Sequence, residues 1–236
     1  RTLQISYPKK KNRPGGEKKP RRMEMDISPH TDCWFCLGNP RFEKHMLAHS
    51  KNGVYVALAK GGFNEYHILV VPVKHYPCWA ALPEETRDEI DSVIMRYNEV
   101  MNSMGMDIVV FERHVPMKQS SANHMNINVV PIPRAYATEA FTAMQSHAKE
   151  AGIEIERIQT RGEVKKMADV EGYPRAYLYF MLPGDNTAKG RQMEHYLYFG
   201  EGKIPMNIGR EVCADILEEP SKVDWRKCKL EQDEEA

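Results

Sequence analysis

The sequence predicts an α+β fold, in which an antiparallel sheet with one long helix is followed by a smaller α+β unit. Three features indicate this: short runs rich in β-branched residues, a single long amphipathic stretch among them, and a second set of helix and strand patterns after residue 135. With 236 residues and an apolar share of 42%, the chain can form real cores in one large or two small domains. No run approaches the roughly 18 apolar residues of a membrane span.

The first unit contains four runs that are typical of strands, and each is rich in Val, Ile or Leu. They are 54–59, 67–73, 107–112 and the run that begins at His124. Residues two apart in a strand share a face. In the last run, one face should therefore enter a core and the other should not: Met125, Ile127 and Val129 point inward, and His124, Asn126 and Asn128 point the other way.

One helix is predicted between Pro83 and Met104. Proline suits a first helical turn, the acidic residues that follow favour the positive end of the helix, and Gly105 ends it. Seven apolar residues recur at the spacing of one buried face: Ile90, Val93, Ile94, Tyr97, Val100, Met101 and Met104.

The second unit has no cluster of cysteines, histidines or carboxylates that suggests chemistry, and we interpret it as a packing and docking module. Its predicted elements are a helix at 139–150, a short strand at 153–158, two hairpin strands at 175–182 and 194–199, and a helix at 209–217.

Charge divides the chain unevenly, although its formal net charge is zero. The first 22 residues carry nine basic residues against one glutamate, with prolines and glycines between them and few apolar residues. Such an arm should not fold alone, and it is typical of a nuclear-import signal or a phosphate-binding tail, with a solvated linker as the plain alternative. Three parts are therefore expected: a basic arm (1–30), a first domain (31–134) and a second domain (135–236). The candidate RNA-binding residues are Lys9, Lys10, Lys11, Arg13, Lys18, Lys19, Arg21 and Arg22.

A Cys-x-x-Cys motif begins at Cys33, and Cys36 completes it. It supplies two thiolates on one tight turn, which is half of a tetrahedral zinc site, and the missing half should be two imidazoles. Reduced buried thiols and a redox pair are the alternatives. A redox pair would follow a strand and precede a helix, whereas here Pro29 precedes the motif and Pro40 follows it. Five cysteines without a signal-peptide pattern are typical of a reducing compartment.

The run from His124 resembles the catalytic strand of the histidine-triad superfamily, His-φ-His-φ-His-φ-φ, with only its first histidine kept. In that superfamily the middle histidine attacks the α-phosphate of a nucleotide. Asn126 stands at this position, and an amide has no basic lone pair with which to form a phosphoramidate. The resemblance thus implies a pseudoenzyme with no catalytic residues. Its degenerate active-site face comprises Asn126, Asn128 and His114, and His114 is the candidate for a substitute nucleophile.

Zinc-bearing members of the same superfamily place a Cys-x-x-Cys motif, a histidine after an "LVVP" strand, and the first triad histidine at characteristic intervals. In this chain His75 follows such a strand 39 residues after Cys36, and His124 lies 49 residues further on. The resemblance therefore implies a structural Zn²⁺ held by Cys33, Cys36, His75 and His124.

Several motifs together resemble the CwfJ C-terminal family of splicing factors, in that family's order and over about residues 31 to 230. They are 33–37, 42–45, 57–62, 110–113, 124–133, 199–200, 209–212 and 224–228. "ALAKGG" and "VVFER" are most similar to the branch that partners the lariat-debranching enzyme.

This resemblance implies a non-catalytic factor of the post-catalytic, intron-lariat spliceosome in the nucleus. Its expected partners are spliceosomal proteins, intron-lariat RNA and the lariat-debranching enzyme, with no membrane. The alternatives are a histidine-triad hydrolase of nucleotides or RNA ends with an atypical nucleophile, and a nucleotide-sensing or protein-docking module that makes no RNA contact.

Overall fold

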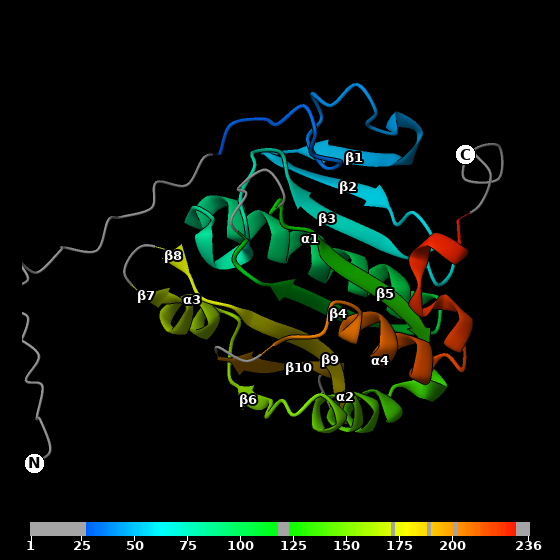
Figure 1. Cartoon of the computed structure of the whole chain (residues 1–236). Coiled ribbons are helices and arrows are strands. Elements are labelled where there is room, and N and C mark those ends of the chain that lie inside the picture. The colour runs from blue at the N-terminus through cyan, green and yellow to red at the C-terminus, as the bar shows by residue number, and fades with distance from the viewer. Residues whose placement is uncertain (1–26, 118–122, 171–172, 188–189, 201–202, 230–236) are drawn as a thin grey trace, which may run out of the picture.

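The structure is a computed structural model that describes residues 27–117, 123–170, 173–187, 190–200 and 203–229. The RNA contacts predicted between Lys9 and Arg22 lie outside the described residues. The fold is α+β, as predicted. Eight antiparallel strands form one sheet in the order β1-β2-β3-β5-β4-β9-β10-β6, and helices lie on both of its faces (Figure 1).

The elements follow the predicted order with small shifts at their ends. The first half of the sheet contains β1 (Leu47–Lys51), β2 (Val54–Leu58), β3 (Ile68–Pro72), β4 (Met106–His114) and β5 (Ile127–Pro133). The second half contains β6 (Glu156–Ile158), β9 (Tyr177–Thr187) and β10 (Gly190–Phe199), and a separate pair is formed by β7 (Asp169–Val170) and β8 (Tyr173–Pro174). Of these, β1 and the β7–β8 pair were not predicted.

The α-helices are α1 (Glu84–Ser103), α2 (Glu139–Glu150), α3 (Gly162–Ala168) and α4 (Ile208–Ile216), of which α3 was not predicted. Short 3-10 turns are η1 (Lys44–Met46), η2 (Trp79–Ala81), η4 (Arg134–Tyr136), η5 (Pro220–Val223) and η6 (Trp225–Lys227). Among the residues that the structure describes, no helix has the length and apolarity to cross a membrane.

Two cores fill the two sides of the sheet because neighbouring strand residues point to opposite faces. On one side, Val110 and Ile127 pack in the core that α1 and α3 close. On the other side, Val109 and Val130 pack in the core that α2 and α4 close. A third, smaller cluster around Tyr55 lies on the second side, where residues of the segment before β1 cover β2 and β3.

The buried stripe of α1 is narrower than predicted. Val100 and Met104 were expected inside, but their relative exposures are 52% and 49%. The buried residues of α1 are Ile90, Ile94, Asn98 and Met101, which follow a single line along the helix. Val100 lies about 100° around the helix from Met101, so it turns away from the sheet.

The sheet continues across the boundary expected near residue 134. β9 pairs with β4 over five residue pairs, from Val110 with Met181 to His114 with Tyr177. β10 then pairs with β9, and β6 with β10. Strands from both halves of the sequence therefore share one hydrogen-bonded sheet.

Candidate metal centre and degenerate catalytic face

The Cys-x-x-Cys turn is fixed to the body of the molecule by polar contacts on either side of its tip. The Cys36 N–H donates to the Cys33 carbonyl at 3.3 Å, and the side-chain amide of Asn39 donates to the same carbonyl at 2.8 Å. The hydroxyl of Tyr55 on β2 donates to the Phe35 carbonyl at 2.7 Å. We call residues 33–36, held in this way, the knuckle.

The two histidines reach the knuckle from the chain that follows β3 and the chain that precedes β5. The His75 N–H donates to the Ile27 carbonyl at 3.2 Å, which holds the segment before the knuckle in place. Nε2 of His124 lies 2.8 Å from the Pro72 carbonyl. Because a carbonyl only accepts, that nitrogen carries the proton, and Nδ1 keeps its lone pair for a metal.

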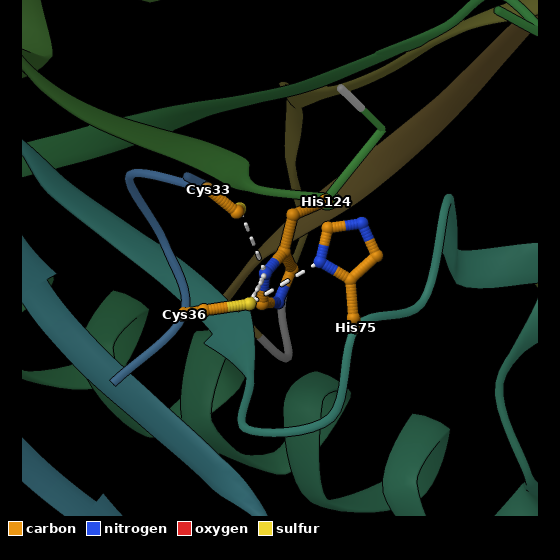
Figure 2. A group of neighbouring side chains, drawn as sticks. All are labelled: Cys33, Cys36, His75 and His124. Carbon is orange, nitrogen blue, oxygen red and sulfur yellow. Dashed lines mark hydrogen bonds between the residues drawn. The ribbon is translucent and has the colours of Figure 1, made fainter. Parts of the chain in front are cut away.

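All four predicted metal ligands are buried and face one another (Figure 2). Their ligand atoms lie within 4.8 Å of one another. Sγ of Cys36 is 3.3 Å from Nδ1 of His75 and 3.5 Å from Nδ1 of His124, and Sγ of Cys33 is also 3.5 Å from Nδ1 of His124. In a tetrahedral site with Zn–S of about 2.3 Å and Zn–N of about 2.0–2.1 Å, a sulfur and a nitrogen would be about 3.6 Å apart. The cluster therefore has the donors and nearly the dimensions of a closed two-Cys, two-His metal site.

Burial sets the protonation of this cluster before any cation binds. It raises the pKa of the Cys33 thiol to about 11 and lowers the pKa of His124 to about 4. At neutral pH Cys33 is then a thiol and His124 a neutral imidazole. A bound cation would be ligated by the neutral imidazole as it stands and would displace the thiol proton, because thiolate is the ligating form.

The face predicted to be a degenerate active site is held by a chain of side-chain hydrogen bonds. Nδ1 of His67 accepts from the Phe63 N–H at 3.3 Å, so Nε2 carries the proton and donates to Oδ1 of Asn128 at 3.2 Å. The Asn128 amide donates in turn to Oδ1 of Asn126 at 3.4 Å. The oxygen of Asn126 is thus used inside the fold, two residues from His124 of the candidate metal centre.

His114 does not belong to this face. It ends β4, where its ring is 5.5 Å from that of Tyr177, and it is buried. Its neighbour two residues back, Glu112, lies on the same side of β4 as Val110, which packs in the core under α1. Asn128 pairs with Phe111, which packs in the core on the opposite side. The strand alternation therefore places His114 across the sheet from Asn126 and Asn128.

Arg210 of α4 closes the edge of this face, a role that its place in the motif 209–212 did not reveal. Its guanidinium donates to the Gly61 carbonyl at 3.0 Å and to the Val223 carbonyl at 3.0 Å. It also lies 4.4 Å from the centre of the Phe63 ring, and that ring stacks on His67 with 5.7 Å between centroids. Burial, and then the positive charge of Arg210, lower the pKa of His67 to about 3, so this imidazole stays neutral.

Comparison with known proteins identifies the family. The family model described as "Protein similar to CwfJ C-terminal" matches residues 19–145, which is more than half of the chain. The chain belongs to this family. The mouse "CWF19-like protein 1" is 32% identical over 227 residues, covering 94% of this chain and 39% of the relative. "Zinc finger CCCH domain-containing protein 64" of Arabidopsis thaliana is 30% identical over 222 residues, covering 93% of this chain and 35% of the relative.

The chain spans less than two fifths of the length of these relatives. Among solved structures, a uridylyltransferase shares 15% identity and a TM-score of 0.43, with 89% of this chain and 95% of that chain covered. This structural similarity is too low to support an assignment, so the family assignment rests on sequence similarity alone.

Proposed function

We propose that this chain is a non-catalytic splicing factor that acts in the nucleus on the post-catalytic, intron-lariat spliceosome. We further propose that it binds RNA and assists the lariat-debranching enzyme in intron turnover. Membership of the CwfJ C-terminal family supports a role in splicing. The basic arm, with nine Lys and Arg residues among the first 22, supports contact with an RNA backbone.

The observation that carries the non-catalytic part is the state of Asn126. It stands where a histidine-triad enzyme has its nucleophile, and its carboxamide oxygen accepts a hydrogen bond from Asn128. An amide in that position can neither attack phosphorus nor carry a proton between substrate and solvent. The nearest imidazole along the hydrogen-bonded chain, His67, is fully buried and hydrogen-bonded through both ring nitrogens.

The metal ligands support a structural role for Zn²⁺. Cys33, Cys36, His75 and His124 would fill all four positions of a tetrahedral site, whereas a catalytic zinc keeps one position open for water or substrate. Bound there, zinc would join the knuckle to the chain after β3 and before β5. This ties the beginning of the described chain to the centre of the sheet.

Two assays on the purified chain separate this proposal from its alternatives. We expect no turnover of an adenosine phosphoramidate by the wild-type protein, and tight binding of single-stranded RNA that weakens with salt. For each single-strand phosphate contact, the affinity should fall by about 0.7 log units for every log unit by which the salt concentration rises. Phosphoramidate turnover that His114→Ala abolishes would instead assign the chain to the hydrolases. An absence of salt-dependent RNA binding would favour a module that docks only proteins or nucleotides.

A further inference from the structure

The tip of the knuckle carries an exposed tryptophan. Trp34 lies between the two cysteines and has a relative exposure of 59%, although tryptophan is among the most buried residue types on average. The guanidinium of Arg41 lies 5.9 Å from the centre of its ring. One aromatic ring and one guanidinium plane are thus displayed together on the surface.

The backbone beneath Trp34 is rigidly held. The carbonyls of its two neighbours, Cys33 and Phe35, accept hydrogen bonds from Asn39 and Tyr55 at 2.8 and 2.7 Å. Cys33 itself belongs to the candidate metal centre. A ring presented from a fixed turn loses little conformational freedom when it binds a partner, which favours affinity.

The surroundings of Trp34 favour a negatively charged partner. Residues 27–46 contain Arg41 and Lys44 against Asp32 and Glu43, and Glu43 is paired with Lys60, so this segment and its ion-pair partner together carry one net positive charge. The other side of the sheet is acidic, since the first half of α1 carries Glu84, Glu85, Asp88, Glu89 and Asp91 against Arg87. Arg22, the last residue of the basic run, precedes Trp34 by 12 positions in the sequence.

We infer that Trp34 and Arg41 form a stacking site for one base of single-stranded RNA. The base would stack on the indole ring, which accepts any base because every base has a π face. Arg41 would add a cationic plane beside it. This inference rests on the proposed function, because it assigns a base-binding residue to the RNA contact proposed there.

The test is a binding titration of the full chain with fluorescein-labelled single-stranded oligoadenylate at several salt concentrations. Trp34→Ala should weaken binding at least about fivefold, the lower end of what one base–aromatic stack contributes. The slope of log affinity against log salt should stay at the wild-type value, because stacking releases no counterions. Arg41→Ala should also lower the affinity and leave the slope at the wild-type value, because its guanidinium is assigned to the base and not to a phosphate. Trp34→Phe keeps an aromatic face and should bind close to wild type.

Phe141→Ala is the matched control, since Phe141 is a 41% exposed aromatic residue on α2, away from the knuckle. It should bind RNA like wild type. Metal content and the thermal midpoint of each variant show whether the knuckle remains folded. Wild-type affinity for Trp34→Ala, or an equal loss in Phe141→Ala, would overturn the stacking site and leave the proposed function standing. Loss of a nuclear protein partner by Trp34→Ala at unchanged RNA affinity would assign this residue to a protein interface. Absence of RNA binding by the wild-type chain would contradict the proposed function itself.

Discussion

At the scale of single residues, the candidate metal centre depends on a few atoms with fixed roles. The Pro72 carbonyl fixes the proton of His124 on Nε2, and Nδ1 then faces Cys33 and Cys36. The two thiols come from one turn and the two imidazoles from two other segments, and all four are buried. Loss of one ligand should leave three donors that bind zinc less tightly and a gap in the packing between the knuckle and the sheet.

Replacing one ligand tests this role. His75→Ala should reduce bound zinc well below one per chain and lower the free energy of unfolding by on the order of 3 kcal/mol. For a chain of this size that corresponds to a fall of roughly 6–12 °C in Tm. Metal analysis and thermal melts measure both quantities. Cys228→Ser is the control, because Cys228 is not part of the cluster, and it should keep both values. Full zinc occupancy in His75→Ala would show that His75 is not one of the zinc ligands.

His67 makes stability depend on pH. The pKa of this imidazole is held near 3 in the folded chain, whereas an unfolded histidine titrates near 6.5. Between these values the unfolded chain binds the proton and the folded chain does not, so stability is greatest above pH 6.5 and falls as the pH is lowered. At pH 5, one and a half units below 6.5, the loss is about 2 kcal/mol.

Denaturant titrations of wild type and His67→Gln at pH 7.5 and pH 5 measure how much unfolding free energy His67 costs on acidification. The variant should start from a lower stability, because its side chain replaces a buried ring, yet lose less on acidification. The other histidines titrate in both proteins and cancel in the comparison. Equal losses in the two proteins would mean that His67 titrates normally in the folded state.

The cluster of candidate metal ligands could be predicted from the sequence because cysteines and histidines are few and their spacing resembles that of zinc-bearing proteins of the histidine-triad superfamily. The structure brings all four together. The contacts of Arg210 could not be predicted, because Gly61 and Arg210 are 149 residues apart and nothing in the local pattern links them. His114 was grouped with Asn126 and Asn128 by proximity in sequence, and the strand alternation separates them. Helical periodicity gave the phase of the α1 stripe but not its width, so Val100 and Met104 were misplaced.

At the scale of elements, the segment of η5 and η6 is fastened to the loop between β2 and β3. Gly61 in that loop has a φ of +64°, and a Cβ there would overlap the carbonyl oxygen of Trp225. Lys222 donates to the Phe63 carbonyl at 2.8 Å, and Arg210 bridges the same two segments. Glycine at position 61 is therefore required both by backbone conformation and by the close approach of η6.

Gly61→Ala should destabilise the chain by about 2–4 kcal/mol, since a left-handed alanine costs about 1–2 kcal/mol and the overlap with Trp225 adds to it. Gly53→Ala separates the two terms, because Gly53 has a φ of +76° and open space where its Cβ would lie. Gly53→Ala should lower the free energy of unfolding by about 1–2 kcal/mol. Urea unfolding measures both variants. Equal losses would mean that the segment of η5 and η6 moves away without cost.

At the scale of the whole molecule, the two halves of the sequence share their sheet and a buried ionic cluster. Arg161, just before α3, donates to Asp91 of α1 at 2.9 Å and to Glu112 of β4 at 3.2 Å. Its guanidinium lies 4.7 Å from the ring centres of both Trp79 and Tyr179. Removing this cation would leave Glu112 buried without its charge partner, which is strongly unfavourable.

We therefore expect the chain to unfold in one cooperative transition, and residues 27–134 alone not to fold, because they would expose the edge of β4 that β9 covers. Differential scanning calorimetry of the full chain and circular dichroism of the fragment test this. Two separate transitions, or a folded fragment, would show that 31–134 and 135–236 are independent domains.

The proposed function is tested most directly by purifying the tagged chain from nuclei and sequencing the RNA that accompanies it. We predict enrichment of excised, branched introns, together with spliceosomal proteins and the lariat-debranching enzyme. A variant without residues 1–22 should lose most of the RNA and keep the protein partners, because the proposal assigns the phosphate contacts to the basic residues of the arm. Recovery of the intact chain without any enrichment of intron lariats would contradict the account.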